Sequence, residues 1–247
     1  MISGRHSDPM DYFYVSPKEI HGRIAVIRGD EFKHLTRVVR KKEGEQIVLL
    51  DGEDNSYQAV IRSIAKEHAE CEILERNQRL NEPAVDVTLA VSILRNPARF
   101  DVLVEKATEL GVRTIIPIVT ERTIPKSEKH ARLEKIALAA MKQCGRAWLP
   151  KILPLASFDE VLSRAGQFSL RLIPHEQSSV STPIVSVPGK HAGSSSILIV
   201  VGPEGGFTEA EVAAAEQNGF LAVSLGPRRL RTETAAIAAV GWIIGNS

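Results

Sequence analysis

The stretch VVGPEGGFTEAE, residues 200–211, runs from an apolar segment through a turn with three glycines and one carboxylate, Glu204. Glycine lets a ligand approach the backbone closely. Thr208 and Glu211 have capping-box spacing, which occupies the first amide groups of the next helix. A carboxylate here repels phosphate, and both the GxxxxGK[ST] and GxGxxG patterns are absent. The turn therefore favours a neutral or cationic ligand; a purely structural β-to-α turn is the alternative.

A second glycine-proline turn, SLGPRRLRTETA at residues 224–235, carries Arg228, Arg229 and Arg231 ahead of another helix. Arginines grouped in this way suit a planar or polyanionic partner, although a solvated basic turn has the same composition. Both turns follow apolar segments that read as strands. Because α/β sheets bind ligands beyond the carboxyl ends of their strands, the two turns define a candidate site.

The composition limits the function classes that are open to the chain. It has 247 residues, 43% of them hydrophobic and 25% charged, with a net charge of +1. This is an ordinary globular composition with no overall positive field, so any nucleic-acid surface must be local. The two cysteines lack CxxC spacing, which argues against a disulfide framework or a zinc site. No secretory leader or long apolar run is present, so we expect a cytoplasmic protein without membrane contact.

The first 75 residues are predicted to form a small β-barrel domain. Residues 22–27, 45–52, 56–64 and 69–75 are short β-rich segments, and Asp30 is the expected cap of one helix over residues 31–39. The polar segment 76–84 contains a proline and has neither helical nor strand periodicity. We therefore expect a domain at 1–75, a linker at 76–84 and a second domain at 85–247.

The second domain alternates strands with helices, which predicts a parallel sheet covered on both faces. Residues 176–196, rich in Ser and Pro, are expected to be an insertion. The expected strands are 85–94, 113–119, 151–156, 169–174, 196–203 and 220–226, and the expected helices are 98–110, 127–144, the segment after Thr208, and 232–244. Asn96 is expected to start the first of these helices and Gly111 to end it, and Ser157 with Glu160 has capping-box spacing.

The two turns, VGPEGGFTEAE and LGPRRLRTETAAI, resemble those of the RsmE family, knotted methyltransferases of the SPOUT superfamily that methylate N3 of a uridine in 16S ribosomal RNA. HLTRVVR, EKATELGV and QCGR extend the resemblance over nearly the whole chain. It implies an α/β fold: a SPOUT-type parallel sheet with a carboxy-terminal trefoil knot, preceded by a PUA-like β-barrel.

The resemblance implies S-adenosylmethionine as cofactor, without a metal, and its positive sulfonium is compatible with a carboxylate. Uracil N3 carries a proton, so methylation requires a base and a cation that stabilises the developing anion. Arg231 is the candidate cation and Glu233 the candidate base, although Glu233 is equally a favourable acid at a helix start. The implied cofactor residues are Gly202, Glu204, Gly205, Leu225, Gly226, Leu230 and Arg231.

The implied partners are 16S ribosomal RNA in the small subunit and, through the last helix, a second copy of the chain. Basic residues clustered in the barrel segment suit a phosphate backbone, with a solvated helix end as the alternative. Rival functions are methylation of a ribose 2′-hydroxyl or of transfer RNA, a non-catalytic RNA-binding module and, more remotely, a nucleotide phosphohydrolase. The candidate RNA-binding residues are His34, Arg37, Arg40, Lys41, Lys42, Arg228 and Arg229.

Overall fold

The computed structural model describes residues 11–175, 182–187, 193 and 195–246. The chain divides into an amino-terminal unit, Met1–Glu82 with Met141–Leu149, and a carboxy-terminal unit, Pro83–Ala140 with Pro150–Ser247. The segment Met141–Leu149 thus belongs with the amino-terminal unit, although its sequence lies inside the expected second domain. Long-range contacts place it there, and these leave no local pattern in the sequence.

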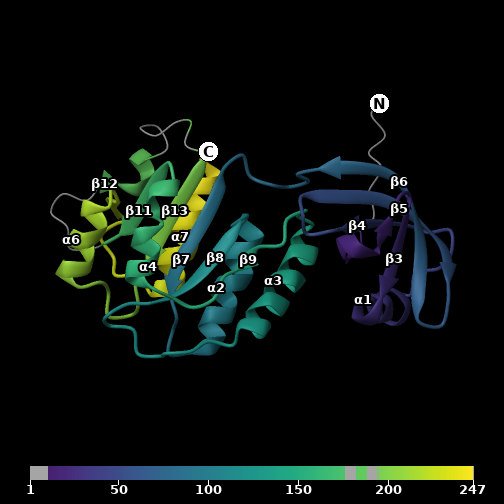
Figure 1. Ribbon diagram of the computed structural model, residues 1–247, viewed down its shortest axis with the longest axis horizontal. Coiled ribbons are helices and arrows are strands. Elements are labelled where there is room, and N and C mark those ends of the chain that lie inside the picture. Colours follow the sequence, from purple (N-terminus) through teal and green to yellow (C-terminus); the bar gives the residue numbers. More distant parts are fainter. Residues whose placement is uncertain (1–10, 176–181, 188–192, 194, 247) are drawn as a thin grey trace. The chain divides into compact units, whose positions relative to one another are not determined.

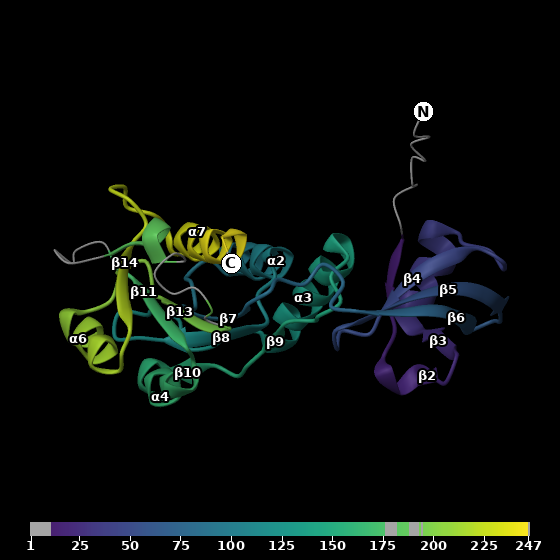
Figure 2. The same cartoon turned by 90° about the horizontal axis from the view of Figure 1, so that it is seen from above.

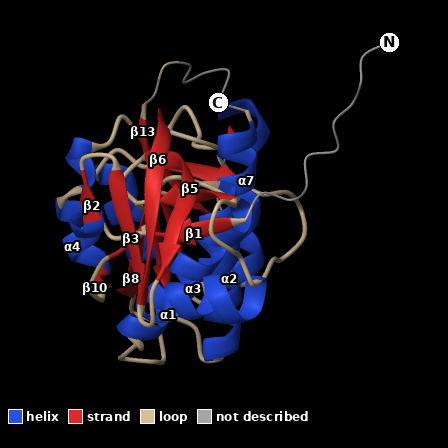
Figure 3. Cartoon of the chain, turned by 90° about the vertical axis from the view of Figure 1, so that its right-hand side faces the viewer, coloured by secondary structure: helices blue, strands red, loops and turns tan. Residues whose placement is uncertain are grey.

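The amino-terminal unit contains a six-stranded sheet in the order β1-β4-β5-β6-β3-β2. Only β1 and β4 pair in parallel; the other neighbours are antiparallel. Two register shifts between β5 and β6 add bulges, which bend paired strands and help the sheet to curl (Figures 1 and 3). The strands are β1 (Tyr12–Tyr14), β2 (Ile20–His21), β3 (Ile24–Arg28), β4 (Gln46–Leu50), β5 (Asn55–Ile64) and β6 (His68–Gln78).

Strand β6 extends to Gln78, so the first residues of the expected linker 76–84 are β-strand. The inner face of this sheet is apolar and includes Cys71, whose burial raises the pKa of its thiol to about 12. The thiol therefore stays protonated and acts as a small core side chain. Cys144 is also free and is half-buried.

A short helix, α1 (Gly29–Lys33), continues into a π-helical turn, η2 (His34–Val39), next to one end of these strands (Figure 3). The prediction that Asp30 caps this helix is wrong. Arg28 occupies the cap position and makes no side-chain capping bond, while Asp30 lies inside the first turn and pairs with Lys33 at 2.8 Å. The unit also contains a 3-10 turn, η1 (Pro17–Glu19).

The carboxy-terminal unit is built on a parallel sheet in the order β10-β8-β7-β13-β11-β14-β12, with β9 also paired to β8. Every pairing in it is parallel, as the alternation of strands with helices predicted. The strands are β7 (Asp86–Ser92), β8 (Thr114–Val119), β9 (Lys151–Ile152), β10 (Ala156–Ser157), β11 (Leu170–Pro174), β12 (Thr182–Pro183), β13 (Ser196–Val201) and β14 (Leu221–Ser224).

Helices cover both faces of this sheet, α2 and α7 on one and α4 and α6 on the other (Figure 2). Their ends follow the predicted signals. Asn96 caps α2 and Gly111 ends it at φ 105°, and both predicted capping boxes form, at Ser157 and at Thr208. The helices are α2 (Pro97–Leu110), α3 (His130–Cys144), α4 (Phe158–Ser163), α6 (Glu209–Gln217) and α7 (Thr232–Gly245), with a 3-10 turn η3 (Ala165–Gln167). None of the helices in the described ranges is both long and apolar enough to cross a membrane.

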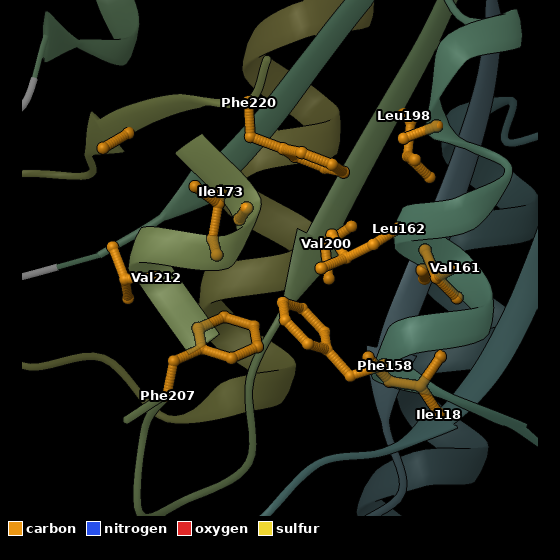
Figure 4. Close-up of a cluster of buried hydrophobic side chains, with 14 residues drawn as sticks. Ile118, Phe158, Val161, Leu162, Ile173, Leu198, Val200, Phe207, Val212 and Phe220 are labelled. Atoms are coloured by element: carbon orange, nitrogen blue, oxygen red, sulfur yellow. The ribbon is translucent and has the colours of Figure 1, made fainter. Parts of the chain in front are cut away.

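A buried cluster on the α4 and α6 face reaches the loop after β13 (Figure 4). The rings of Phe158 and Phe207 lie 5.3 Å apart between centroids. Val200 of β13 and Val212 of α6 belong to the same cluster. Phe207 therefore anchors the glycine turn 202–206 to the core.

Most of the expected insertion at 176–196 lies outside the described residues. Within its described part, β12 pairs in parallel with β14 and is followed by η4 (Ile184–Ser186), in which Ile184 is buried. This short piece is therefore part of the sheet unit. The trefoil knot stays a prediction.

Candidate functional site

A cavity of about 320 Å³ opens at the carboxyl ends of β11, β13 and β14. This is the edge at which parallel sheets bind ligands. Six of the seven residues predicted to hold a cofactor line it: Gly202, Glu204, Gly205, Leu225, Gly226 and Leu230. The other lining residues are Arg122, Pro174, His175, Val201, Pro203, Gly206, Phe207, Arg228, Arg229, Thr232 and Ala235.

The glycines of the first turn serve different purposes. A Cβ atom at Gly202 would lie 3.0 Å from the Phe207 ring, so a larger residue would displace that core anchor. Gly206 has φ 70° and its amide donates to Pro203 O at 2.9 Å, closing a tight turn. A Cβ at Gly206 or at Gly226 would meet no protein atom within 4 Å, so space beside both residues is open to a ligand.

Glu204 connects this turn with two other loops. Its Oε1 atom accepts a hydrogen bond from the backbone amide of Arg95 at 3.3 Å, in the segment between β7 and α2. Its backbone carbonyl accepts a bond from Arg229 Nη2 at 3.2 Å. The carboxylate at the centre of the turn thus holds a neighbouring backbone segment.

The amino terminus of α6 has little free capacity for an anion. Thr208 Oγ1 accepts from the Glu211 amide at 3.2 Å, and Glu211 Oε2 accepts from the Thr208 amide at 2.8 Å. Glu211 Oε1 accepts a further bond, from the Glu121 amide. The inference from the sequence that phosphate is a poor ligand for this helix end agrees with this geometry.

The second turn approaches the cavity mainly through backbone and aliphatic groups. Gly226 has φ 105°, in the left-handed region that favours glycine, and its amide donates to Ser224 Oγ at 3.2 Å. Leu225 and Leu230 add apolar lining, while Arg228 and Arg229 are exposed at the mouth. A ligand with an apolar body and polar ends suits this mixture.

Comparison with known proteins decides the family. The family model described as an RNA methyltransferase domain matches residues 81–244, and that of an RNA methyltransferase PUA domain matches residues 27–74. The Bacillus subtilis protein named ribosomal RNA small subunit methyltransferase E is 31% identical over 226 residues, which is 88% of each chain. The Aquifex aeolicus protein of the same name is 31% identical over 95% of this chain and 99% of its own. The chain belongs to the ribosomal RNA small subunit methyltransferase E family.

A solved structure of a family member supports the same fold. It is the Neisseria gonorrhoeae ribosomal RNA small subunit methyltransferase E bound to S-adenosylmethionine. That protein is 34% identical to this chain, superposes with a TM-score of 0.81 and aligns over 94% of this chain and 95% of its own. The curled amino-terminal sheet and the parallel sheet unit are therefore the fold of this methyltransferase family.

The structure separates the two predicted catalytic residues of this family member from the cavity lining. Arg231 is exposed at the cap position of α7, between Leu230 and Thr232, which do line the cavity. Glu233 lies in the first turn of the helix, where its Oε1 atom is 3.7 Å from Arg99 Nε of α2. Arg231 is thus adjacent in sequence to two lining residues, whereas Glu233 packs between two helices.

The sequence did not predict two polar side chains of the cavity lining, those of Arg122 and His175. Arg122 lies in the turn after β8, and His175 directly follows β11. Each lies within three residues of the carboxyl end of a strand of the parallel sheet, and that position was the available signal in the sequence. Neither residue has a local motif around it that marks it as a ligand.

The predicted RNA-binding residues of the PUA-like domain lie on or just after η2. Arg37 and Lys42 are exposed, and Arg40 has φ 61° at the end of the turn. Lys41 is less available because its Nζ atom pairs with Asp11 at 2.9 Å, and the His34 ring packs edge-on against Phe13. No group of three His, Cys, Asp or Glu side chains that could hold a metal occurs in the described ranges.

Proposed function

We propose that the chain transfers a methyl group from S-adenosylmethionine to N3 of a uridine in 16S ribosomal RNA of the small subunit. The observation that carries the proposal is the cavity built by two glycine turns at the carboxyl ends of the parallel strands, in a chain of this family. A family member, the Neisseria protein, is bound to S-adenosylmethionine. The other specificities, a ribose 2′-hydroxyl or transfer RNA, use the same cofactor and are separated only by the product.

The residues of the cavity fit this cofactor. Backbone groups beside Gly206 and Gly226 border open space, and Leu225 and Leu230 supply apolar surface for an adenosine. The carboxylate of Glu204 places negative charge at the rim, which is compatible with a sulfonium. When bound, the cofactor supplies an electrophilic methyl group, and no metal is needed to hold it.

The protein must remove the N3 proton and stabilise the negative charge that develops on the uracil. Arg231 remains our candidate for the stabilising cation, because the residues on both sides of it line the cavity. For the proton acceptor we now propose His175. It lies in the lining, whereas Glu233 faces Arg99.

We further propose that the PUA-like domain binds ribosomal RNA through Arg37, Arg40 and Lys42 and that the chain forms a homodimer through α7. Val102 of α2 is 47% exposed and Trp242 of α7 is 40% exposed, and these two helices pack together. Ala238 of α7 is small and exposed, so a second helix can approach closely there. A dimer would cover this apolar surface.

Methylation of small-subunit particles from a strain that lacks the corresponding gene tests the function. The modified nucleoside, identified by mass spectrometry, should be 3-methyluridine; a ribose-methylated product would assign another specificity. Calorimetry with S-adenosylmethionine in the presence of a chelator should give undiminished binding. A protein that binds RNA but no cofactor would be the non-catalytic RNA-binding module.

A further inference from the structure

Arg122 connects the turn after β8 to the glycine turn after β13. Its Nη1 atom donates hydrogen bonds to the carbonyl oxygens of Gly205 at 2.9 Å and Phe207 at 3.3 Å. Its aliphatic stem lies against Gly205, where an added Cβ would be 3.4 Å from Arg122 Cβ. One side chain therefore contacts both ends of the Gly205–Phe207 segment.

The turn that carries Arg122 is fixed by three buried hydroxyl groups. Thr123 Oγ1 lies 2.7 Å from Ser92 Oγ and 3.0 Å from Thr120 Oγ1, and it accepts the Thr120 amide at 2.9 Å. Ser92 ends β7, and Thr120 directly follows β8. The hydroxyl cluster therefore ties the carboxyl ends of two central strands to the turn, and this gives Arg122 a rigid base.

The same turn also restrains the helix end of residues 202–208, the segment called the cofactor loop below. The Glu121 amide donates to Glu211 Oε1 at 2.8 Å, and Glu211 belongs to the capping box of α6. Residues 121 and 122 thus restrain both the glycine turn and the helix that follows it. Such restraint is needed because Gly205 and Gly206 have wide conformational freedom of their own.

We propose that Arg122 is a positioning residue that fixes the peptide planes of the cofactor loop. A peptide unit is planar, so fixing the Gly205 carbonyl also orients the Gly206 amide, and fixing the Phe207 carbonyl orients the Thr208 amide. The ordered loop then presents a preformed surface to the ligand, which reduces the ordering cost of binding. The part of this inference that concerns S-adenosylmethionine rests on the proposed function; the ordering of the loop does not.

Amide hydrogen exchange in the ligand-free protein tests whether Arg122 orders this loop. In Arg122→Met, which keeps most of the side-chain length but loses both hydrogen bonds, amides of residues 204–208 should exchange at least about tenfold faster, because losing even one hydrogen bond to a charged group has about this effect. Arg122→Lys should remain close to wild type, because both bonds start from a single nitrogen that an ammonium group can replace. Thr123→Val, which disrupts the hydroxyl base, should also accelerate exchange in this loop.

Arg171→Met is the matched control. Arg171 also donates to backbone carbonyls, of Phe168 and Asn218, but these lie where β11 and β14 begin, away from the cavity. It should leave exchange at 204–208 unchanged. Unchanged exchange in Arg122→Met would overturn the proposal, as would equal acceleration in Arg171→Met.

Measurements of cofactor binding distinguish a positioning role of Arg122 from direct contact between Arg122 and the cofactor. Calorimetry should show that Arg122→Met weakens S-adenosylmethionine and 5′-methylthioadenosine, which lacks the amino-acid group, by the same factor, about tenfold. Loss of affinity for S-adenosylmethionine alone would make Arg122 a contact of the cofactor carboxylate and overturn the positioning role. In methylation assays, KM for the cofactor should rise while kcat changes by less than about threefold. If the wild-type chain binds neither ligand, the proposed function fails, and the exchange data still decide the role of Arg122.

Discussion

The Nε atom of Arg99 lies 3.7 Å from Oε1 of Glu233 and links α2 to the first turn of α7. The Glu233 side chain is only 13% exposed, and its Oε2 atom is buried without a hydrogen-bond partner in the described part of the chain. A carboxylate held in this way between two helices is poorly placed to receive a proton from a substrate in the cavity. It can stabilise the helix pair and the amino terminus of α7.

We therefore predict that Glu233→Gln retains methylation activity within about threefold at saturating cofactor. The variant should lose the ion pair and the favourable charge at the helix start, which together contribute about 1 kcal/mol. Urea denaturation and single-turnover methylation measure the two effects separately. A rate loss of 100-fold without loss of stability would instead restore Glu233 as the base.

His175→Gln, in contrast to Glu233→Gln, should lose most of its methylation activity. If His175 accepts the N3 proton, removing it should lower the rate of methylation by about 100-fold or more, which is typical for loss of a general base. Cofactor affinity should change little, and the loss should shrink at high pH as the uracil ionises without help. A variant whose rate is unchanged at neutral pH would exclude this role.

Local signals in the sequence predicted the helix ends, the parallel sheet and the place of the two glycine turns. The helix caps at Asn96, Ser157 and Thr208 and the helix end at Gly111 depend on residues only a few positions apart, and all of them form. The parallel sheet follows from uninterrupted apolar strands. The two glycine turns were therefore placed at the correct edge of the sheet.

Contacts between distant residues could not be predicted. Arg122 and Gly205 are 83 positions apart, and Arg146 and Glu82 are 64 positions apart, so no spacing rule connects either pair. Asp30 fails as a cap for a different reason. It has the right residue type, but the helix begins two residues earlier than expected, at Gly29, so that Arg28 holds the cap position.

Arg231→Ala should lower the methylation rate at saturating cofactor by about 100- to 1,000-fold, by analogy with the loss of one oxyanion donor. If its guanidinium stabilises charge on the uracil, the effect is confined to the transition state, so cofactor affinity should fall only modestly. Arg231→Lys should recover part of the rate, because an ammonium cannot supply two parallel donors. A variant that keeps its rate would show that Arg231 only helps to build the pocket.

The PUA-like domain offers a graded test of RNA binding. Arg37→Ala with Lys42→Ala should weaken binding to ribosomal RNA and reduce the slope of log affinity against log salt by about one unit per lost phosphate contact. Lys41→Ala should do less, because its ammonium already pairs with Asp11. Filter binding over a range of salt concentrations measures both. Equal effects of the two variants, or none, would contradict this assignment of the basic surface.

Arg146 should be among the most sensitive positions for stability. Its Nε and Nη2 atoms donate to the two carboxylate oxygens of Glu82 at 3.1 and 2.6 Å, and the Trp148 amide donates to Glu82 Oε1 at 2.8 Å. The Arg146 side chain is 2% exposed and that of Glu82 is fully buried. Because removing one partner leaves a buried charge uncompensated, Arg146→Met should destabilise the amino-terminal unit by about 3–5 kcal/mol.

Trp148 fluorescence in a Trp242→Phe background reports the unfolding of that unit during urea denaturation, since the chain has only these 2 tryptophans. Arg62→Met is the matched control. Arg62 pairs with Glu72 in the same unit, but its side chain is 60% exposed, so its loss should cost less than about 1 kcal/mol. The buried pair holds Met141–Leu149 to the segment that follows β6, a connection that runs between residues 64 positions apart. Similar costs for the two arginines would show that burial does not strengthen this pair and that the segment is held by its apolar contacts.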